Sequence, residues 1–135
     1  MKIPTDLQVL SDIYEQNYIS FCNFSVSDKS RANKLYVPID IESIAFKLEV
    51  DPDIIFGRLY YHLEEKYSYQ KKDGSWVHFF SLNIGGDRHV VNFPLLASVL
   101  AGLKEERDKN NRSMFFSLFA IVISLSTLIA KVLGG

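Results

Sequence analysis

The feature that most constrains this chain is a run of eighteen uncharged residues, Ser113 to Ala130, near its C-terminal end. A helix rises about 1.5 Å per residue, so the run spans about 27 Å, close to the roughly 30 Å hydrocarbon core of a bilayer. Ten of its residues are Phe, Leu, Ile or Val, which together favour insertion by roughly 3 to 6 kcal/mol. We therefore predict a transmembrane helix over residues 113–133. The alternative is a buried core helix, which would normally show a polar face.

The charges beside this run predict its orientation. Lys104, Arg107, Lys109 and Arg112 precede it, whereas only Lys131 follows it. Cytoplasmic flanks of membrane spans carry an excess of Lys and Arg, so the N-terminal part is expected in the cytoplasm. The first residues hold no long apolar stretch typical of a secretory signal. The prediction is a single-pass, tail-anchored protein of the cell inner (plasma) membrane.

Composition limits what the N-terminal part does. Residues 1–112 suffice for one domain and not for two. They hold 14 Lys+Arg against 16 Asp+Glu once Lys131 is set aside, a net charge of −2. Such a balance argues against unaided nucleic-acid binding. The single Cys22 excludes an internal disulfide framework and suits a reducing compartment.

Hydrophobic periodicity and turn signals predict an ordered series of helices and strands. Thr5 and Asp40 are the expected N-caps of the first and second helices, and Asp51-Pro52 is a strong helix start. Asp73-Gly74 between two aromatic-rich runs is a hairpin signal. The expected elements are a helix over 6–21, an edge strand over 34–39, helices over 41–48 and 52–66, strands over 67–71 and 75–82, a less clear turn and strand over 84–91, and a helix from Pro94.

The segments IESIAFKLEV and DPDIIFGRLYYHLEEKY, followed by a hairpin with Asp73-Gly74 at its tip, resemble the winged helix-turn-helix superfamily over about 41–82. The resemblance implies a mainly α fold with a small β-hairpin wing (α+β), followed by a single transmembrane helix. The expected divisions are a winged-helix-like cytosolic domain over 1–93, a connecting helix over 94–112 and the span over 113–133. Winged helices bind DNA, RNA or proteins, so the fold does not choose a function.

The third helix would be the recognition helix of a DNA reader. Placing Ile55, Leu59 and Leu63 inward leaves an outer surface that is aromatic and mildly acidic, whereas groove readers present donors such as Arg, Lys and Asn. Exposed aromatic residues suit a protein interface better, although they also pack against neighbouring elements in many domains. The candidate contact residues on this helix and the hairpin are Phe56, Arg58, Tyr60, Tyr61, His62, Lys66, Lys71 and Lys72.

Catalysis and cofactor binding have little support in the sequence. His62, His78 and His89 are scattered, without metal-ligand spacing. Gly85-Gly86 is a lone dipeptide, far short of a phosphate-binding loop. No set of nucleophile, base and orienting group is apparent. We therefore expect a protein that is not an enzyme and that needs no metal or cofactor.

Small, hydroxylated or charged residues recur along one face of the predicted span at heptad spacing. Small and hydroxyl residues let helices approach closely in lipid and hydrogen-bond across the contact. The alternative is that the hydroxyls bond back to their own helix. We predict a homo-oligomer through this seam, whose members are Ser113, Ser117, Ala120, Ser124, Thr127 and Lys131.

Three functional hypotheses follow. In the first, the cytosolic domain binds a partner, protein rather than nucleic acid, and holds it at the membrane. In the second, the chain is a small effector of a phage-defence or toxin kind, and its Ser/Thr seam oligomerises and perturbs the bilayer. In the third, it is a membrane-tethered regulator that binds DNA.

Overall fold

Helix α1 (Asp6–Cys22) begins at the predicted cap. Thr5 Oγ1 accepts a hydrogen bond from the Gln8 backbone N–H at 3.1 Å, and Gln8 Oε1 accepts one from the Thr5 backbone N–H at 2.9 Å. This reciprocal capping box satisfies two backbone donors at the helix start.

The computed structural model describes residues 2–134 of the chain. The chain divides into two units, Met1–Leu100 and Ala101–Gly135. The predicted division at residues 93 and 112 stays a prediction.

Two further helices follow the first strand, β1 (Tyr36–Pro38). Helix α2 (Ile41–Leu48) has Asp40 as N-cap, as predicted, and α3 (Pro52–Gly57) starts at Pro52 behind the cap Asp51. The chain then continues helically through η1 (Arg58–Leu63) and α4 (Glu64–Tyr67). The η1 segment is a π-helical turn, because the Glu64 N–H donates to the Leu59 carbonyl five residues back. The predicted helix over 52–66 is therefore present, with a widened middle.

The core of the first unit lies between these helices and a small sheet. Ile55, Leu59 and Leu63 are fully buried, which confirms the predicted inward face of the third helix. Helix α1 contributes Val9, Leu10 and Ile13, and α2 contributes Ile44 and Ala45. The strands, the residue before β4 and the start of α5 contribute Val37, Phe79, Phe80, Val90, Val91, Phe93 and Leu96.

Two small antiparallel sheets complete the fold, and one strand prediction was wrong. The Asp73-Gly74 hairpin exists, but its strands β2 (Tyr69–Gln70) and β3 (Trp76–Val77) hold two residues each. The predicted strand over 75–82 is broken because Phe79 and Phe80 are both buried in succession, against the alternation that a single strand needs.

The chain after this break forms a second hairpin. Strands β4 (Phe80–Ile84) and β5 (Asp87–Asn92) turn at Gly85 and Gly86, which both have positive φ angles that glycine adopts without strain. Strand β5 also pairs with β1 in the register Val37↔Val91, so the three-stranded sheet has the order β1-β5-β4. Strand β1 lies at its edge, as predicted, and Pro38 suits that place because it has no N–H to donate to a further strand.

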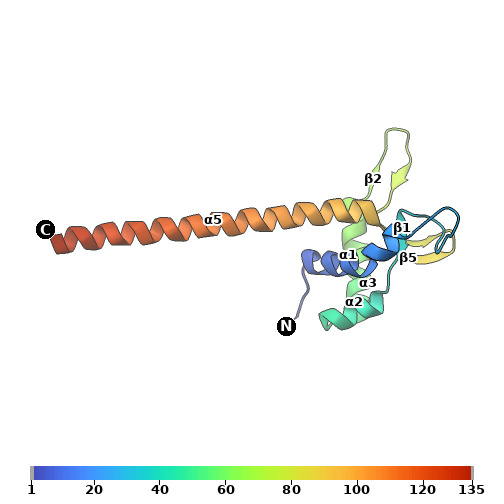
Figure 1. The fold of residues 1–135 in the computed structure, drawn as a ribbon, viewed down its shortest axis with the longest axis horizontal. Helices are drawn as coiled ribbons and strands as arrows, with labels where there is room; N and C mark the ends of the chain where they lie inside the picture. Colours follow the sequence, from blue (N-terminus) through green and yellow to red (C-terminus); the bar gives the residue numbers. More distant parts are fainter. Residues whose placement is uncertain (1, 135) are drawn as a thin grey trace. The chain divides into compact units, whose positions relative to one another are not determined.

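Helix α5 runs without interruption from Phe93 to Gly134 and is drawn in orange to red in Figure 1. Its first turns belong to the first unit, where Phe93, Leu96 and Leu100 are buried. The rest of the helix, from Ala101, forms the second unit. Helical structure continues through Asn110-Asn111 and across the whole predicted span.

Candidate functional site

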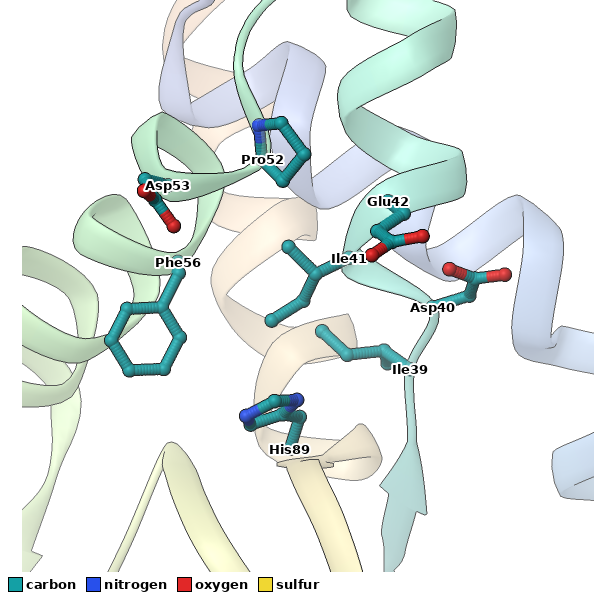
Figure 2. Close-up of a pocket in the computed structure, with 8 residues that line it drawn as sticks. All are labelled: Ile39, Asp40, Ile41, Glu42, Pro52, Asp53, Phe56 and His89. Atoms are coloured by element: carbon teal, nitrogen blue, oxygen red, sulfur yellow. The ribbon is translucent and has the colours of Figure 1, made fainter.

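A groove of about 500 Å³ lies in the first unit where α2, α3 and β5 meet. Figure 2 shows Glu42 and Ile41 from α2 facing Pro52, Asp53 and Phe56 from α3. Ile39, Asp40 and His89 complete the lining. The volume is within the range of about 300–1,000 Å³ that is typical of ligand pockets.

The floor of the groove is apolar and packed. Ile39 and Ile41 are buried, and the half-buried Phe56 meets the His89 ring edge-on at a centroid distance of 5.7 Å. His89 also stacks on Phe80 at 6.3 Å, and its backbone has a φ of 54°. The neighbours of His89 therefore hold it as a wall of the groove.

The rim is acidic. Asp40, Glu42 and Asp53 are exposed, and within residues 2–134 none of their carboxylates forms an ion pair. Asp40 Oδ1 accepts a hydrogen bond from the Ser43 N–H at 3.1 Å, as the cap of α2. The groove thus combines an apolar floor with free negative charge.

An aromatic strip leads from this groove along the helix. Phe56 stacks on Tyr60 at 5.5 Å, and Tyr60 meets Tyr61 at 4.9 Å. Tyr60 is 40% exposed and Tyr61 is 74% exposed. Three predicted contact residues, Phe56, Tyr60 and Tyr61, therefore form one continuous surface.

The predicted cations of this helix are placed differently. Arg58 Nη1 lies 2.9 Å from Asp6 Oδ1 with both side chains largely buried, and His62 Nε2 lies 3.2 Å from Asp6 Oδ2. Arg58 is therefore neutralised at the start of α1, fifty-two residues away in the sequence. Lys66 lies over the Tyr67 ring at 5.3 Å.

The β2–β3 hairpin carries the other predicted cations. Lys71 and Lys72 are exposed at its turn, and Tyr69 and Trp76 are exposed on its strands. Figure 1 shows this hairpin, labelled β2, projecting away from α2 and α3. Its lysines are not among the residues that line the groove, so the predicted contact residues do not form a single surface.

A carboxylate that sequence reasoning missed joins the helix to the sheet. Glu64 Oε1 accepts hydrogen bonds from the backbone N–H of Phe79 at 2.8 Å and of Phe80 at 3.3 Å, and Glu64 Oε2 lies 2.8 Å from His78 Nδ1. Burial raises the pKa of Glu64, but the hydrogen bonds with His78, Ser68 and the two backbone amides together outweigh it and lower the pKa overall. These contacts join the helix to the start of β4.

The second unit carries a long run of exposed apolar side chains. Its large apolar residues from Met114 to Leu133 are 50% to 82% exposed. Among the described residues, α5 is the one helix long and apolar enough to cross a membrane. This finding confirms the predicted apolar span at the coarse level of a candidate membrane helix.

The seam residues are exposed along that helix. Thr127 Oγ1 donates to the Ile123 carbonyl at 3.0 Å, so this hydroxyl bonds back to its own helix. Ser126, outside the seam, does the same to Val122 at 2.9 Å. The other members of the seam, Ser113, Ser117, Ala120, Ser124 and Lys131, are exposed for contacts between helices.

Over residues 2–134 no three His, Cys, Asp or Glu side chains are grouped to hold a metal ion. Comparison with protein-family models, curated proteins and solved structures found no match to this chain.

Proposed function

We propose that this protein is a membrane-anchored binding module whose N-terminal unit holds a protein partner at the inner membrane. The observation that carries the proposal is the exposed apolar surface of α5, which follows in the sequence a unit with its own core. Exposure of so many Phe, Leu, Ile and Val side chains to water is unfavourable, whereas their transfer into the hydrocarbon core of a bilayer is favourable.

The order of elements in the first unit supports a winged-helix interpretation. Helix, edge strand, helix, tight turn, helix and hairpin follow one another as in the superfamily that the sequence resembles. An extra hairpin, β4–β5, follows the one at Asp73-Gly74 and pairs with the edge strand.

Protein is favoured over nucleic acid as the partner because of the charges around the third helix. Asp6 neutralises Arg58, the central cation of that helix, and Asp40, Glu42 and Asp53 surround its N-terminal half. These carboxylates would repel phosphates, on which most nucleic-acid affinity depends. The same observation opposes the membrane-tethered DNA regulator.

Cys22 provides a direct test of orientation, because it is the only cysteine of the chain and its side chain is exposed. A membrane-impermeant maleimide should label Cys22 in permeabilised cells and leave it unlabelled in intact cells. Labelling in intact cells would place the N-terminal unit outside and contradict the proposal.

Partner binding is tested by affinity purification of the full chain in mild detergent. The proposal expects a co-purifying protein that is lost with Tyr61→Ala and retained with Tyr69→Ala, an exposed aromatic on the separate hairpin. Equal recovery with both variants would remove the aromatic strip from the interface.

The second candidate, a membrane-perturbing effector, is favoured by the seam of small and hydroxyl residues on α5. Expression of the chain should then depolarise cells, and Ser117→Leu with Ser124→Leu should abolish the effect. Absence of depolarisation with the native chain would remove this candidate.

A further inference from the structure

We propose that the groove between α2 and α3 binds a basic, amphipathic peptide segment of the partner protein. This inference rests on the proposed function, since it names the chemistry of the partner and the place where it docks. The groove, its free carboxylates and the adjoining aromatic strip carry it.

The sign of the charge selects a cationic partner. Asp40, Glu42 and Asp53 supply three negative charges at the rim. The helix dipoles offset part of this negative charge. The dipole of α2 and that of the helix that begins with α3 each place about half a positive charge at the N-terminal end. A net charge of about −2 remains, so the groove attracts Lys and Arg and repels phosphate and carboxylate groups.

The floor requires that the segment also carry apolar side chains. Ile39, Ile41 and Phe56 form an apolar base inside the charged rim. If a purely hydrophilic peptide covered this apolar base, charged groups would lose their hydration without any gain from apolar contact. An apolar side chain in the groove with Lys or Arg at the rim satisfies both surfaces.

The aromatic strip extends the contact beyond the groove. Phe56 belongs to both surfaces, and the path from His89 through Phe56 and Tyr60 to Tyr61 is continuous, with successive ring centroids 5.7, 5.5 and 4.9 Å apart. Tyr and Phe rings bind both apolar groups and cations. A helical or extended segment that lies along this path would therefore place several side chains on compatible surface.

The inference is tested with the full chain in nanodiscs of zwitterionic phosphatidylcholine, which does not itself attract basic peptides. The probes are a short synthetic amphipathic peptide of Lys, Arg and Leu, the same peptide with Glu in place of Lys and Arg, the same peptide with Ser in place of Leu, and a DNA duplex. Fluorescence anisotropy measures binding of each labelled probe. We expect that only the basic peptide with Leu binds.

The decisive variant removes charge without changing shape. Glu42→Gln with Asp53→Asn should weaken binding of the basic peptide about tenfold or more, because both exposed carboxylates line the groove. The matched control is Glu65→Gln with Asp28→Asn, which makes the same two chemical changes at exposed sites outside the groove and should bind as the native chain does. Circular dichroism verifies that both variants keep the native helix content.

Three results would overturn the inference: equal weakening by both double variants, equal binding of the acidic or the Ser-containing peptide, or binding of the DNA duplex in place of the peptide. Failure here is distinguishable from failure of the proposed function. A chain that inserts into membranes and captures a partner through Tyr61, yet ignores the basic peptide, would retain the proposed function and lose only the groove as its docking site.

Discussion

Replacement of Glu64 by alanine should destabilise the N-terminal unit by about 2–4 kcal/mol. The carboxylate accepts from the backbone N–H groups of Phe79 and Phe80, whose residues are 0% and 2% exposed. Hydrogen bonds to charged groups contribute about 1.5–3 kcal/mol each. The longer hydrogen bond from Phe80, at 3.3 Å, and the contact with the exposed His78 each contribute less to stability. The loss of all these contacts therefore costs about 2–4 kcal/mol.

Two companion variants sharpen this prediction. Glu64→Gln keeps an oxygen acceptor and loses the charge, so its destabilisation should be about half as large. Glu65→Ala removes the neighbouring carboxylate, which is exposed, and should change stability by less than about 0.5 kcal/mol. Urea unfolding of the full chain in mild detergent, followed by the fluorescence of Trp76, measures all three. Trp76 is the only tryptophan and lies 6.5 Å from the His78 ring.

The pH dependence follows from the lowered pKa of Glu64. Because the folded pKa lies below the ordinary value of 4.5, this group contributes stability that is fully present above pH 4.5. That contribution is lost as the pH falls through the folded pKa. The stability difference between the native chain and Glu64→Gln should therefore shrink in acid. A difference that stays constant from neutral pH to below the folded pKa, or equal stability of the Ala variants at 64 and 65, would refute the reasoning.

Further predictions concern the core, the turn and the span. Leu59→Ala should lower the free energy of unfolding by about 2–5 kcal/mol because Leu59 is fully buried, whereas the exposed Tyr61→Ala should lower it far less; urea unfolding compares them. Gly85→Ala should destabilise more than Gly86→Ala in thermal unfolding, since both φ angles are positive but only at Gly85 would a Cβ lie 2.6 Å from Ala32 Cβ; equal losses would contradict the clash. Ser117→Leu with Ser124→Leu should weaken self-association of the full chain in micelles, whereas Ser126→Leu, on another face and bonded to its own helix, should not; analytical ultracentrifugation measures the difference.

Local signals in the sequence predicted much of the fold. Thr5, Asp40 and Asp51 begin helices where caps were expected, because capping depends only on residues within one turn. The buried face of Ile55, Leu59 and Leu63 follows from helical periodicity alone. The apolar run of α5 likewise needs no tertiary information.

Contacts between distant residues were not predictable in the same way. The sheet depends on Val37 meeting Val91, and Arg58 meets Asp6 across fifty-two residues. Glu64 accepts hydrogen bonds from the amides of Phe79 and Phe80, fifteen and sixteen residues ahead, where the chain passes from β3 to β4. Buried Arg31 similarly donates to the carbonyls of Ser20 and Lys34 from within a polar loop. No local pattern signals such partners, so the groove and its free carboxylates became apparent only in three dimensions.

Alkaline carbonate extraction of cell membranes tests the central claim most directly. The full chain should remain in the membrane pellet, because insertion of the apolar run is favourable by roughly 3 to 6 kcal/mol. Ile121→Asp with Leu125→Asp should release it, since two aspartates near the middle of the span oppose insertion by about 5–7 kcal/mol. Ile121→Ala with Leu125→Ala, the matched control, should remain in the pellet. Recovery of the native chain in the soluble fraction, as a dispersed and folded protein, would contradict the account.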